Sequence, residues 1–541
     1  MAAIADFLSD IVDGLSWAAF ALALGGLAWT VIVLRVQDSD SPFSGAPVHR
    51  AIDLIGKGAL VLAIAQVLEL AADAYILDAT MGRSPFPALY GAAFFRAGSA
   101  RALLAFAMAA AAAWLGAAPH DKRRWWSVSA FGLAIVVAGA WHSHGQSRIH
   151  DRELLMALTT LHSLAGAIWV GGVLHLLGLR SLAKRDDRIR PLWPVAIRRF
   201  SLLGMGAVGT AIATAIVLAL YYVRSFAGLF GTGYGSMVLV KIALFLTALC
   251  FAGLNYRAGR QSGTGRDGDA VWRVVPFYVE AETFVLIALL MAAAALAHQP
   301  PALDLTNTDA SIAEVLHVFV PKAPRITSPT HAEMPTDPNN LLGLSRQDRN
   351  LESAWSEYNH NVTGLVLVTM AVIAFLSRLK GFGWARHWPL GFVLLAIFLF
   401  IRSDPETWPL GDVPFLKSLA DAEVFQHRVA ILLAAVLGLI EWRARTTRRK
   451  DAWQAYVFPV LSAFGGLLLL THSHGAFEIK PQYLIQVSHT VMGLFAMFLA
   501  IGRWLELKLE PPASRWAGLG ATASLLLIGF ILTFYQELGT V

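Results

Sequence analysis

Two short histidine strings are the residues in this 541-residue chain whose types and spacing point most directly to chemistry. A His-x-His-Gly string occurs at 142–145 and again at 472–475, so that His142 and His144 are matched by His472 and His474. Neutral imidazole is a strong ligand for copper, zinc, nickel and haem iron. Two imidazoles one residue apart at the end of a helix can be directed at one ion. The strings therefore predict metal binding.

Each string precedes an apolar run with an embedded histidine, and a glycine follows that histidine four residues later. The pairs are His162 with Gly166 and His489 with Gly493, and a third pair, His360 with Gly364, opens another run. Glycine on the same helical face lets a neighbour or a cofactor approach closely. The repeat of this arrangement in two halves suggests a duplication, or convergence on one chemistry. With His427 added, the predicted metal ligands are His142, His144, His162, His360, His427, His472, His474 and His489.

The elements that must position these histidines are apolar runs long enough to cross a membrane. The chain is 56% hydrophobic and 15% charged, whereas soluble domains are about 45–50% apolar and about 25% charged. Runs of about 20 residues span the hydrocarbon core as helices, since barrel strands need only about 10. The sequence predicts an all-α polytopic membrane protein with about 14 spans and an interfacial helix over 4–15. The spans are 14–34, 52–74, 100–118, 126–141, 153–179, 200–222, 236–256, 275–297, 359–377, 389–401, 421–442, 454–471, 483–502 and 516–536.

The distribution of basic residues predicts the orientation of these spans. About two thirds of the 43 Lys and Arg residues fall in one alternating set of loops, which the positive-inside rule assigns to the cytoplasm. Both termini and the proline-rich segment 298–358 are then periplasmic. The predicted domains are an eight-span half at 1–297, a periplasmic linker or cap at 298–358 and a six-span half at 359–541. All eight predicted ligands lie in the outer layer of the membrane, with His162 deepest at roughly 13 Å.

Other features narrow the class of protein. The formal charge of +6 comes from the basic loops, so we expect the lipid bilayer and no nucleic acid as a partner. The single cysteine, Cys250, excludes disulfide frameworks and multi-cysteine metal sites. Neither a phosphate-binding loop nor an Asp-Lys-Thr-Gly string is present, so we expect no ATP-driven pump and a transporter or binding protein rather than an enzyme. Further polar or sulfur-bearing candidates within the spans are Glu69, Asp73, Lys241, Glu280, Glu282, His175, Met205, Met237 and Met291.

The stretch from Leu154 to Arg260 resembles the copper resistance D (CopD) family of bacterial inner-membrane proteins. The matching residues are His162 followed by Ala-Ile-Trp-Val-Gly-Gly at 167–172, then Arg-Phe-Ser at 199–201, Thr-Gly-Tyr-Gly at 232–235 with Lys241, and Asn-Tyr-Arg at 255–257. The likeness covers spans 5 to 8 well and the first four loosely. The six-span half shares only the His-x-His-Gly element and the histidine after it.

The resemblance implies copper handling at the periplasmic face, as Cu(I) or Cu(II), and transport across the inner membrane. It also implies a small periplasmic copper-binding partner of the CopC type, which we expect to be a separate protein. Two alternatives stay open. Histidines of the six-span half could ligate haem b in a redox protein, with the glycines making room for the porphyrin. A three-histidine copper site with an open position could also be catalytic.

Overall fold

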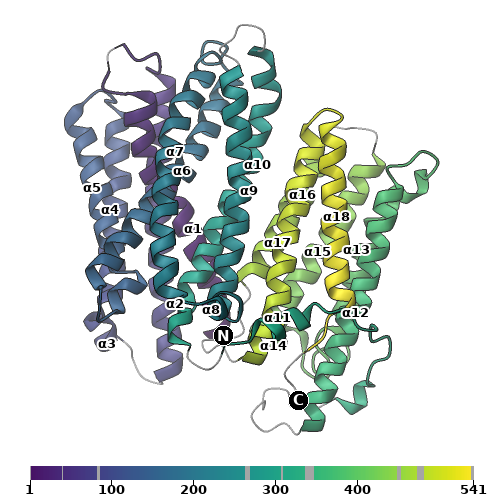
Figure 1. Ribbon diagram of the computed structural model, residues 1–541. Coiled ribbons are helices and arrows are strands. Elements are labelled where there is room, and N and C mark those ends of the chain that lie inside the picture. Colours follow the sequence, from purple (N-terminus) through teal and green to yellow (C-terminus); the bar gives the residue numbers. More distant parts are fainter. Residues whose placement is uncertain are drawn as a thin grey trace.

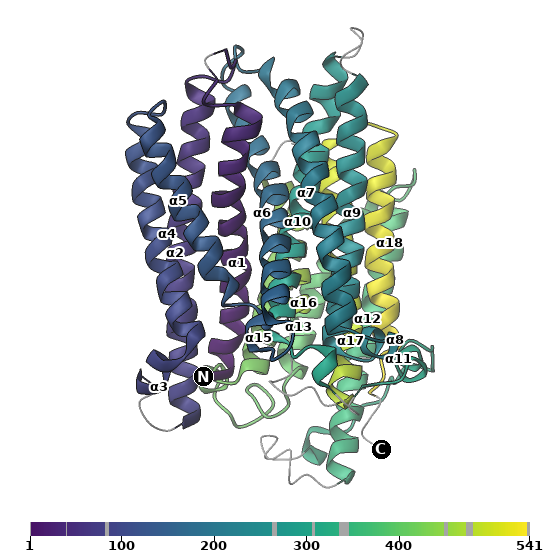
Figure 2. The same cartoon turned by 60° about the vertical axis from the view of Figure 1, so that its left-hand side comes forward.

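The computed structural model describes residues 2–38, 40–81, 86–261, 268–305, 309–334, 346–447, 453–471 and 480–537. The described residues form helices that run side by side along one common direction (Figures 1 and 2). Every one of the 14 predicted spans falls on a helix. Twelve helices of the described residues are long and apolar enough to cross a membrane. The prediction of an all-α polytopic membrane protein is thereby confirmed.

The two predicted spans that do not meet these criteria are helices α5 and α13. Helix α5 (Lys122–Ala140) begins with the basic sequence Lys122-Arg123-Arg124, and α13 (Leu390–Arg402) has 13 residues. Asp121 caps α5 by accepting a hydrogen bond from the backbone N–H of Arg123 at 2.8 Å. Both helices still pack beside long helices of the bundle.

The N-terminal half is built around helix α1, which packs against α2, α6 and α10. Helices α4 and α5 continue outward from α2, and α7 and α9 continue from α6 and α10 (Figure 1). The bounds in this half are α1 (Ala2–Ala28, continued by a π-helical turn Trp29–Leu34), α2 (Ala46–Met81), α3 (Phe86–Gly91), α4 (Ala93–Gly116), α5 (Lys122–Ala140), α6 (Arg152–Ala183), α7 (Leu192–Tyr222), α8 (Phe226–Phe230), α9 (Gly233–Gln261) and α10 (Gly268–His298).

The expected interfacial helix over 4–15 is not a separate element. These residues are the first turns of α1, in line with the span that follows. Ile4 and Phe7 are buried, and Asp10 is only 6% exposed. Because this segment lies against α10 at its apolar and acidic positions, it belongs to the bundle rather than to the membrane surface.

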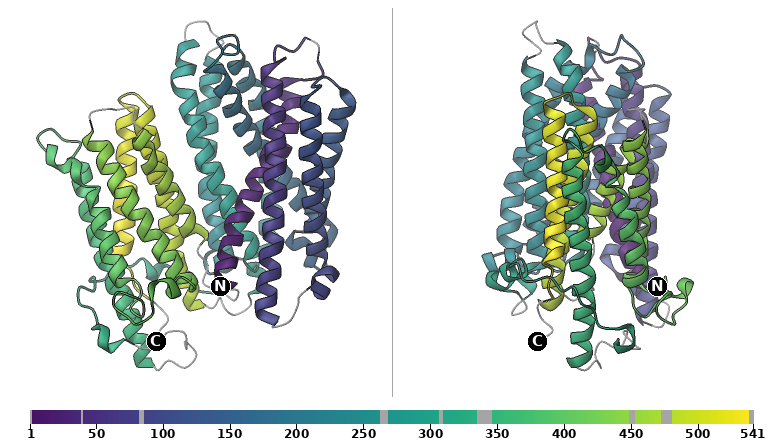
Figure 3. Two further views of the ribbon diagram at one scale, coloured as in Figure 1. Left: turned by 180° about the vertical axis from the view of Figure 1, so that it is seen from behind. Right: turned by 90° about the vertical axis from the view of Figure 1, so that its right-hand side faces the viewer.

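The C-terminal half is a ring of six helices. Around the ring each helix contacts the next in the order α12, α18, α17, α16, α15 and α13, and α13 contacts α12 again. The bounds are α12 (Arg346–Leu376), α13 (Leu390–Arg402), α15 (Ala422–Thr446), α16 (Val457–Thr471), α17 (Lys480–Lys508) and α18 (Ala513–Thr533), with the short helix α14 (Phe415–Ser418) between α13 and α15. Figure 3 shows the two halves side by side.

Glycines allow the closest helix crossings in both halves. A Cβ on Gly171 of α6 would lie 2.0 Å from the carbonyl oxygen of Ala21 in α1. In the other direction, a Cβ on Gly25 of α1 would lie 2.3 Å from the carbonyl oxygen of Ala167. Such small-residue contacts let helix backbones approach in a membrane, where van der Waals packing drives helix association.

The two halves meet where α9 and α10 pack against α16 and α17. The rings of Phe284 and Trp504 are 4.9 Å apart between centroids, and Trp504 Nε1 donates to Glu280 Oε2 at 3.2 Å. At the opposite end of the bundle, Tyr483 donates to the carbonyl oxygen of Phe230 at 2.5 Å. Apolar residues of α16 and α17 belong to the same buried core as those of α10, so the halves share one interior.

The described part of 298–358 crosses the end of the bundle at which α1 begins and α18 ends (Figure 1). It contains the short helix α11 (Ile312–Val318), whose Ser311 and Glu314 form a capping box. Arg148 pairs with Asp304 at 2.6 Å on the first half, and Arg325 pairs with Glu357 at 3.1 Å on the second. The segment therefore connects the ends of both halves. We refer to this end, which the sequence predicts to be periplasmic, as the outer end.

Candidate metal centre

Three aromatic side chains from three neighbouring helices meet at the outer end of the C-terminal ring. His360 lies on α12, His489 lies on α17, and Tyr535 follows the end of α18. The two imidazole rings are perpendicular with centroids 5.7 Å apart, and Tyr535 stacks on His360 at 4.0 Å. Two of the predicted ligands, 129 positions apart in the sequence, are thus brought into contact.

The backbone fixes the orientation of both imidazoles. His360 Nδ1 lies 2.9 Å from the carbonyl oxygen of Ser356, and His489 Nδ1 lies 3.1 Å from that of Ile485. These carbonyls accept the Nδ1 proton, and the lone pair of each ring is then on Nε2. A histidine that ligates a metal usually donates its other ring N–H in this way. The tautomer suited to an Nε2 ligand is therefore built into both helices.

His427 on α15 is oriented by a carboxylate instead. Its Nδ1 lies 2.6 Å from Oδ1 of Asp404, a residue of the loop after α13 that is only 6% exposed. Burial raises the pKa of Asp404, but the bond to His427 and the charge of Arg428 more than offset it, so the net pKa is lowered. The carboxylate is therefore ionised at neutral pH. Carboxylate–histidine pairs of this kind orient imidazoles in metal sites.

Arg428 holds the loop that carries Asp404. It donates to the carbonyl oxygen of Phe400 and to Oγ1 of Thr407, each at 2.7 Å. His331 of the outer segment also contacts this loop, with Nε2 2.8 Å from the carbonyl oxygen of Pro405. Asn359, next to His360, donates to the carbonyl oxygen of Arg402, two residues before Asp404, at 2.8 Å. Three predicted ligands of the C-terminal half thus occupy the same outer region, supported by two groups that the sequence analysis missed, Asp404 and Tyr535.

The rest of the predicted C-terminal ligands, His472 and His474, lie outside the described residues, in the connection between α16 and α17. Among the described residues, no group of three or more His, Cys, Asp or Glu side chains is close enough together to hold a metal ion. A complete ligand set is therefore still a prediction.

The N-terminal histidines contact different helices. His162 Nδ1 lies 3.1 Å from the carbonyl oxygen of Ala211 and 3.0 Å from Oγ1 of Thr214, both on α7. The ring of His142 lies against α4, where a Cβ on Gly98 would be 3.1 Å from its Nε2. His144 begins a 3-10 turn, His144–Ser147, and its side chain is not described. The described contacts give no direct approach between His142 and His162.

Three other polar candidates, Glu280, Glu282 and His175, are engaged in structural contacts. Glu280 pairs with Arg180, and Glu282 accepts a hydrogen bond from Asn255 at 2.8 Å, so within the described contacts neither carboxylate pairs with Lys241. His175 is 2% exposed and its Nε2 lies 3.0 Å from the carbonyl oxygen of Leu22. His175 is thus a core histidine of the α1–α6 contact.

The glycines after two histidines serve helix packing. A Cβ on Gly364 would lie 2.1 Å from the backbone nitrogen of Thr533 in α18, and one on Gly493 would lie 3.0 Å from the carbonyl oxygen of Gly466 in α16. Gly166 has open space around it. Since neighbouring helices fill the space at Gly364 and Gly493, the described residues give no support to a porphyrin bound there.

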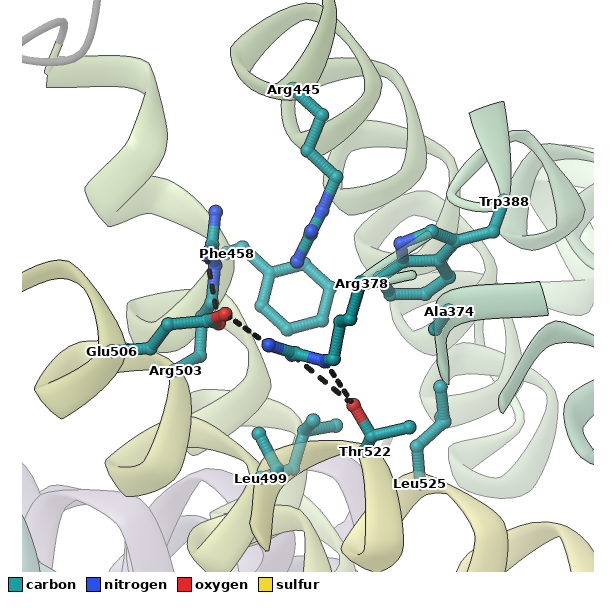
Figure 4. A pocket seen from close by; sticks show the side chains of 11 residues that line it. Ala374, Arg378, Trp388, Arg445, Phe458, Leu499, Arg503, Glu506, Thr522 and Leu525 are labelled. Carbon is teal, nitrogen blue, oxygen red and sulfur yellow. Dashed lines mark hydrogen bonds and ion pairs between the residues drawn. The ribbon is translucent and has the colours of Figure 1, made fainter. Parts of the chain in front are cut away.

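A pocket at the opposite end of the C-terminal ring has a different character (Figure 4). Glu506 accepts from Arg378 at 2.5 Å and from Arg503 at 2.9 Å. Arg503 also pairs at 3.0 Å with Glu441, which is fully buried and in turn holds Arg445 at 2.6 Å. These ion pairs join α15 and α17 to the end of α12. The pocket is therefore lined by a structural ion-pair network.

The fold defines the class of this protein as a multi-pass membrane protein, and the comparisons with known proteins place it in the bacterial inner membrane. Residues 194–296 match the model of the family described as copper resistance protein D, so this stretch, which includes most of α7 and α10 and all of α9, is a CopD domain.

One curated relative is the copper transport protein CutJ of Bacillus subtilis (strain 168). It is 28% identical over 153 residues, which are 28% of this chain and 28% of that protein. The matched stretch therefore spans less than a third of the relative. No solved structure matches the chain. The family match and this relative support a copper-related function in the membrane.

Proposed function

We propose that this protein binds copper at the periplasmic side of the inner membrane and carries it across. The observation that supports the proposal most is the contact between the rings of His360 and His489 at the outer end of a chain that contains a CopD domain, with His427 oriented by Asp404 on a neighbouring helix of the same ring. Each of these imidazoles has its Nδ1 engaged by a carbonyl or carboxylate oxygen, which favours coordination through Nε2. Imidazole nitrogen suits both oxidation states of copper.

The two halves would have different roles in transport. The C-terminal ring would capture the ion, with His472 and His474 as further donors. The N-terminal half, which contains the CopD domain, would then provide the route inward, past His162 and the buried thioethers of Met237 and Met291. Thioether sulfur is a soft donor that suits Cu(I). Met205, the third methionine considered, is 52% exposed on the outside of the bundle and is not included in this route.

A CopC-type periplasmic protein would deliver the ion. The outer segment with α11 and the loop that carries Asp404 form the surface that such a donor would meet. Movement of copper would be downhill or coupled to another ion, since the chain contains no ATP-binding string.

The test is copper uptake into proteoliposomes that contain the purified protein. We expect His360→Ala with His489→Ala to reduce uptake to the rate of protein-free liposomes. His49→Ala is the matched control, because His49 is an exposed histidine in the first turn of α2, at the end of the bundle opposite the outer end. Normal uptake by the double variant would contradict the proposal. Elemental analysis of the purified protein that shows iron with a haem spectrum, in place of copper, would do so too.

A further inference from the structure

A second group of ionisable side chains lies at the outer end of the N-terminal half, away from the predicted copper ligands. His298, the last residue of α10, contacts two aspartates of α1. Its Nδ1 hydrogen-bonds Oδ1 of Asp10, and its Nε2 lies 4.0 Å from Oδ2 of Asp13. The side chain of His298 is 43% exposed, whereas those of Asp10 and Asp13 are 8% and 16% exposed. The imidazole therefore stands between the outer surface and two largely buried acids.

The buried side of this group contains more acid than base. Asp13 interacts electrostatically with Glu69 of α2 and with Arg101 of α4. The remaining charged groups that face the cluster are Asp73 of α2 and, at its exposed rim, Asp6 of α1.

Five carboxyl groups thus face one guanidinium and one imidazole. Even with the imidazole protonated, ionisation of all five would leave three uncompensated negative charges within membrane-spanning helices. Unpaired charge among the side chains of membrane-spanning helices is unfavourable. Protons on some of the carboxyl groups remove this cost.

Polar atoms without hydrogen-bond partners next to the acids also indicate that some of the carboxyl groups are protonated. Gln66 of α2 is fully buried, and its amide nitrogen donates to Oε2 of Glu69. The carbonyl oxygen of that amide and Oε1 of Glu69 both lack a hydrogen-bond partner, as does Nε of Arg101, which is 5% exposed. Two buried acceptor oxygens without a donor are costly. A proton on Glu69 turns one of these acceptors into a donor.

We propose that Asp10, Asp13, Glu69 and His298 form a proton-exchange site, in which His298 transfers protons between the outer solution and the buried carboxyl groups. Asp10 exchanges a proton with the imidazole nitrogen to which it is hydrogen-bonded, and Asp13 exchanges one with the other nitrogen through a water molecule that bridges the 4.0 Å between them. No bond other than O–H and N–H is made or broken. The ligand is a proton, and no metal ion is required.

The site is placed to sense or drive events at the first histidine string. Arg101 lies against the end of α5, where a Cβ on Gly139, three residues before His142, would be 3.8 Å from its Nε. Its charge acts on Glu69 and Asp13 on one side and on His142 on the other. Loss of a proton from the acids would increase the negative charge beside Arg101 and so change the field at His142. This coupling to copper, unlike the proton site itself, rests on the proposed function.

Infrared spectroscopy of the purified protein tests the proton site without copper. We expect the carbonyl band of protonated carboxylic acids at neutral pH, its loss on alkalinisation, and a smaller band in Asp13→Asn with Glu69→Gln. Asp53→Asn, at the other end of α2, is the control and should keep the wild-type band. Asp13→Glu preserves the acid and should keep the wild-type band too, which separates loss of a proton from loss of folding.

An unchanged band in the double variant would overturn the proposal. A metal ion retained by the wild type and lost in Asp10→Asn would also overturn it, in favour of a cation site.

Proteoliposomes with an enclosed pH-sensitive dye test the coupling. Addition of Cu(I) outside should change the internal pH of wild-type vesicles, and His298→Gln should abolish this change while Asp53→Asn retains it. Copper uptake without any pH change in the wild type would overturn the coupling. If wild-type protein moves no copper, the proposed function fails, and the infrared result still decides the proton site.

Discussion

At the scale of single residues, the orientation of the imidazoles carries the most information. His360 and His489 are held by their own helices, because a carbonyl oxygen four residues earlier lies within hydrogen-bonding distance of Nδ1. His427 depends on another segment, since its partner Asp404 is 23 positions away. The first two orientations use a carbonyl oxygen of the same helix. The third requires the tertiary structure.

This difference makes Asp404 a sensitive position. We predict that Asp404→Asn weakens copper binding by about 10-fold or more, as is usual when a group that orients a metal-ligating histidine is changed. The measurement is a competition titration of the purified protein with a chelator. Asp412→Asn, an exposed position of the same loop, is the control. Equal affinities for the two variants would show that His427 does not act through Asp404.

Residue types and spacing identified part of the site in advance. The prediction of His360 and His489 followed from the glycine-spaced repeat, and the structure brings these two residues into contact. Asp404, Tyr535 and the pair of Asp10 with His298 were missed. The members of that pair are 288 positions apart, and no local pattern connects them. The one available signal was acidic residues in an otherwise apolar first helix.

At the scale of elements, hydropathy predicted the helices well and their ends less well. All 14 predicted spans are helical, because a backbone in hydrocarbon must satisfy its own hydrogen bonds. The boundary of α12 differs most. It begins at Arg346, and the predicted span begins at 359, because polar residues extend the helix beyond the apolar run. The prediction of a separate interfacial helix was wrong for a related reason, because α1 continues its backbone hydrogen bonds through the acidic residues.

Glycine contacts offer a test of how closely the helices pack. Gly171→Ala places a methyl group 2.0 Å from the carbonyl oxygen of Ala21, so we expect it to destabilise the protein by about 1–3 kcal/mol. Gly166→Ala, five residues earlier on the same helix, meets open space. It should stabilise α6 by about 0.5–1 kcal/mol, the usual gain in a helix interior.

Thermal unfolding in detergent measures both variants. The expected result is a lower midpoint for Gly171→Ala and an unchanged or higher one for Gly166→Ala. A similar decrease for both would mean that α6 does not pack against α1 at Gly171.

At the scale of the whole molecule, the contact of His360 with His489 and the outer segment share one end of the bundle, while the ion-pair network of Glu506 occupies the other. The fold alone does not say which end faces the periplasm. The basic loops predict it, and they place the Glu506 network toward the cytoplasm.

Labelling of single cysteines in whole cells measures this orientation. In a Cys250→Ala background, Asp412→Cys should react with a membrane-impermeant thiol reagent, because its loop lies at the outer end. Arg188→Cys, in the exposed loop between α6 and α7, should react only after the cells are lysed. The reverse pattern would invert the molecule and place the histidines on the cytoplasmic side.

The contact of α1 with α10 also has a consequence for biogenesis. Helix α1 is synthesised first, but His298 follows Asp10 by 288 residues, on the order of tens of seconds at ribosomal speed. During that interval Asp10 of α1 lacks the imidazole of His298 as its partner. We therefore expect α1 to stay beside the translocon, in contact with water or with an insertase, until α10 has been synthesised.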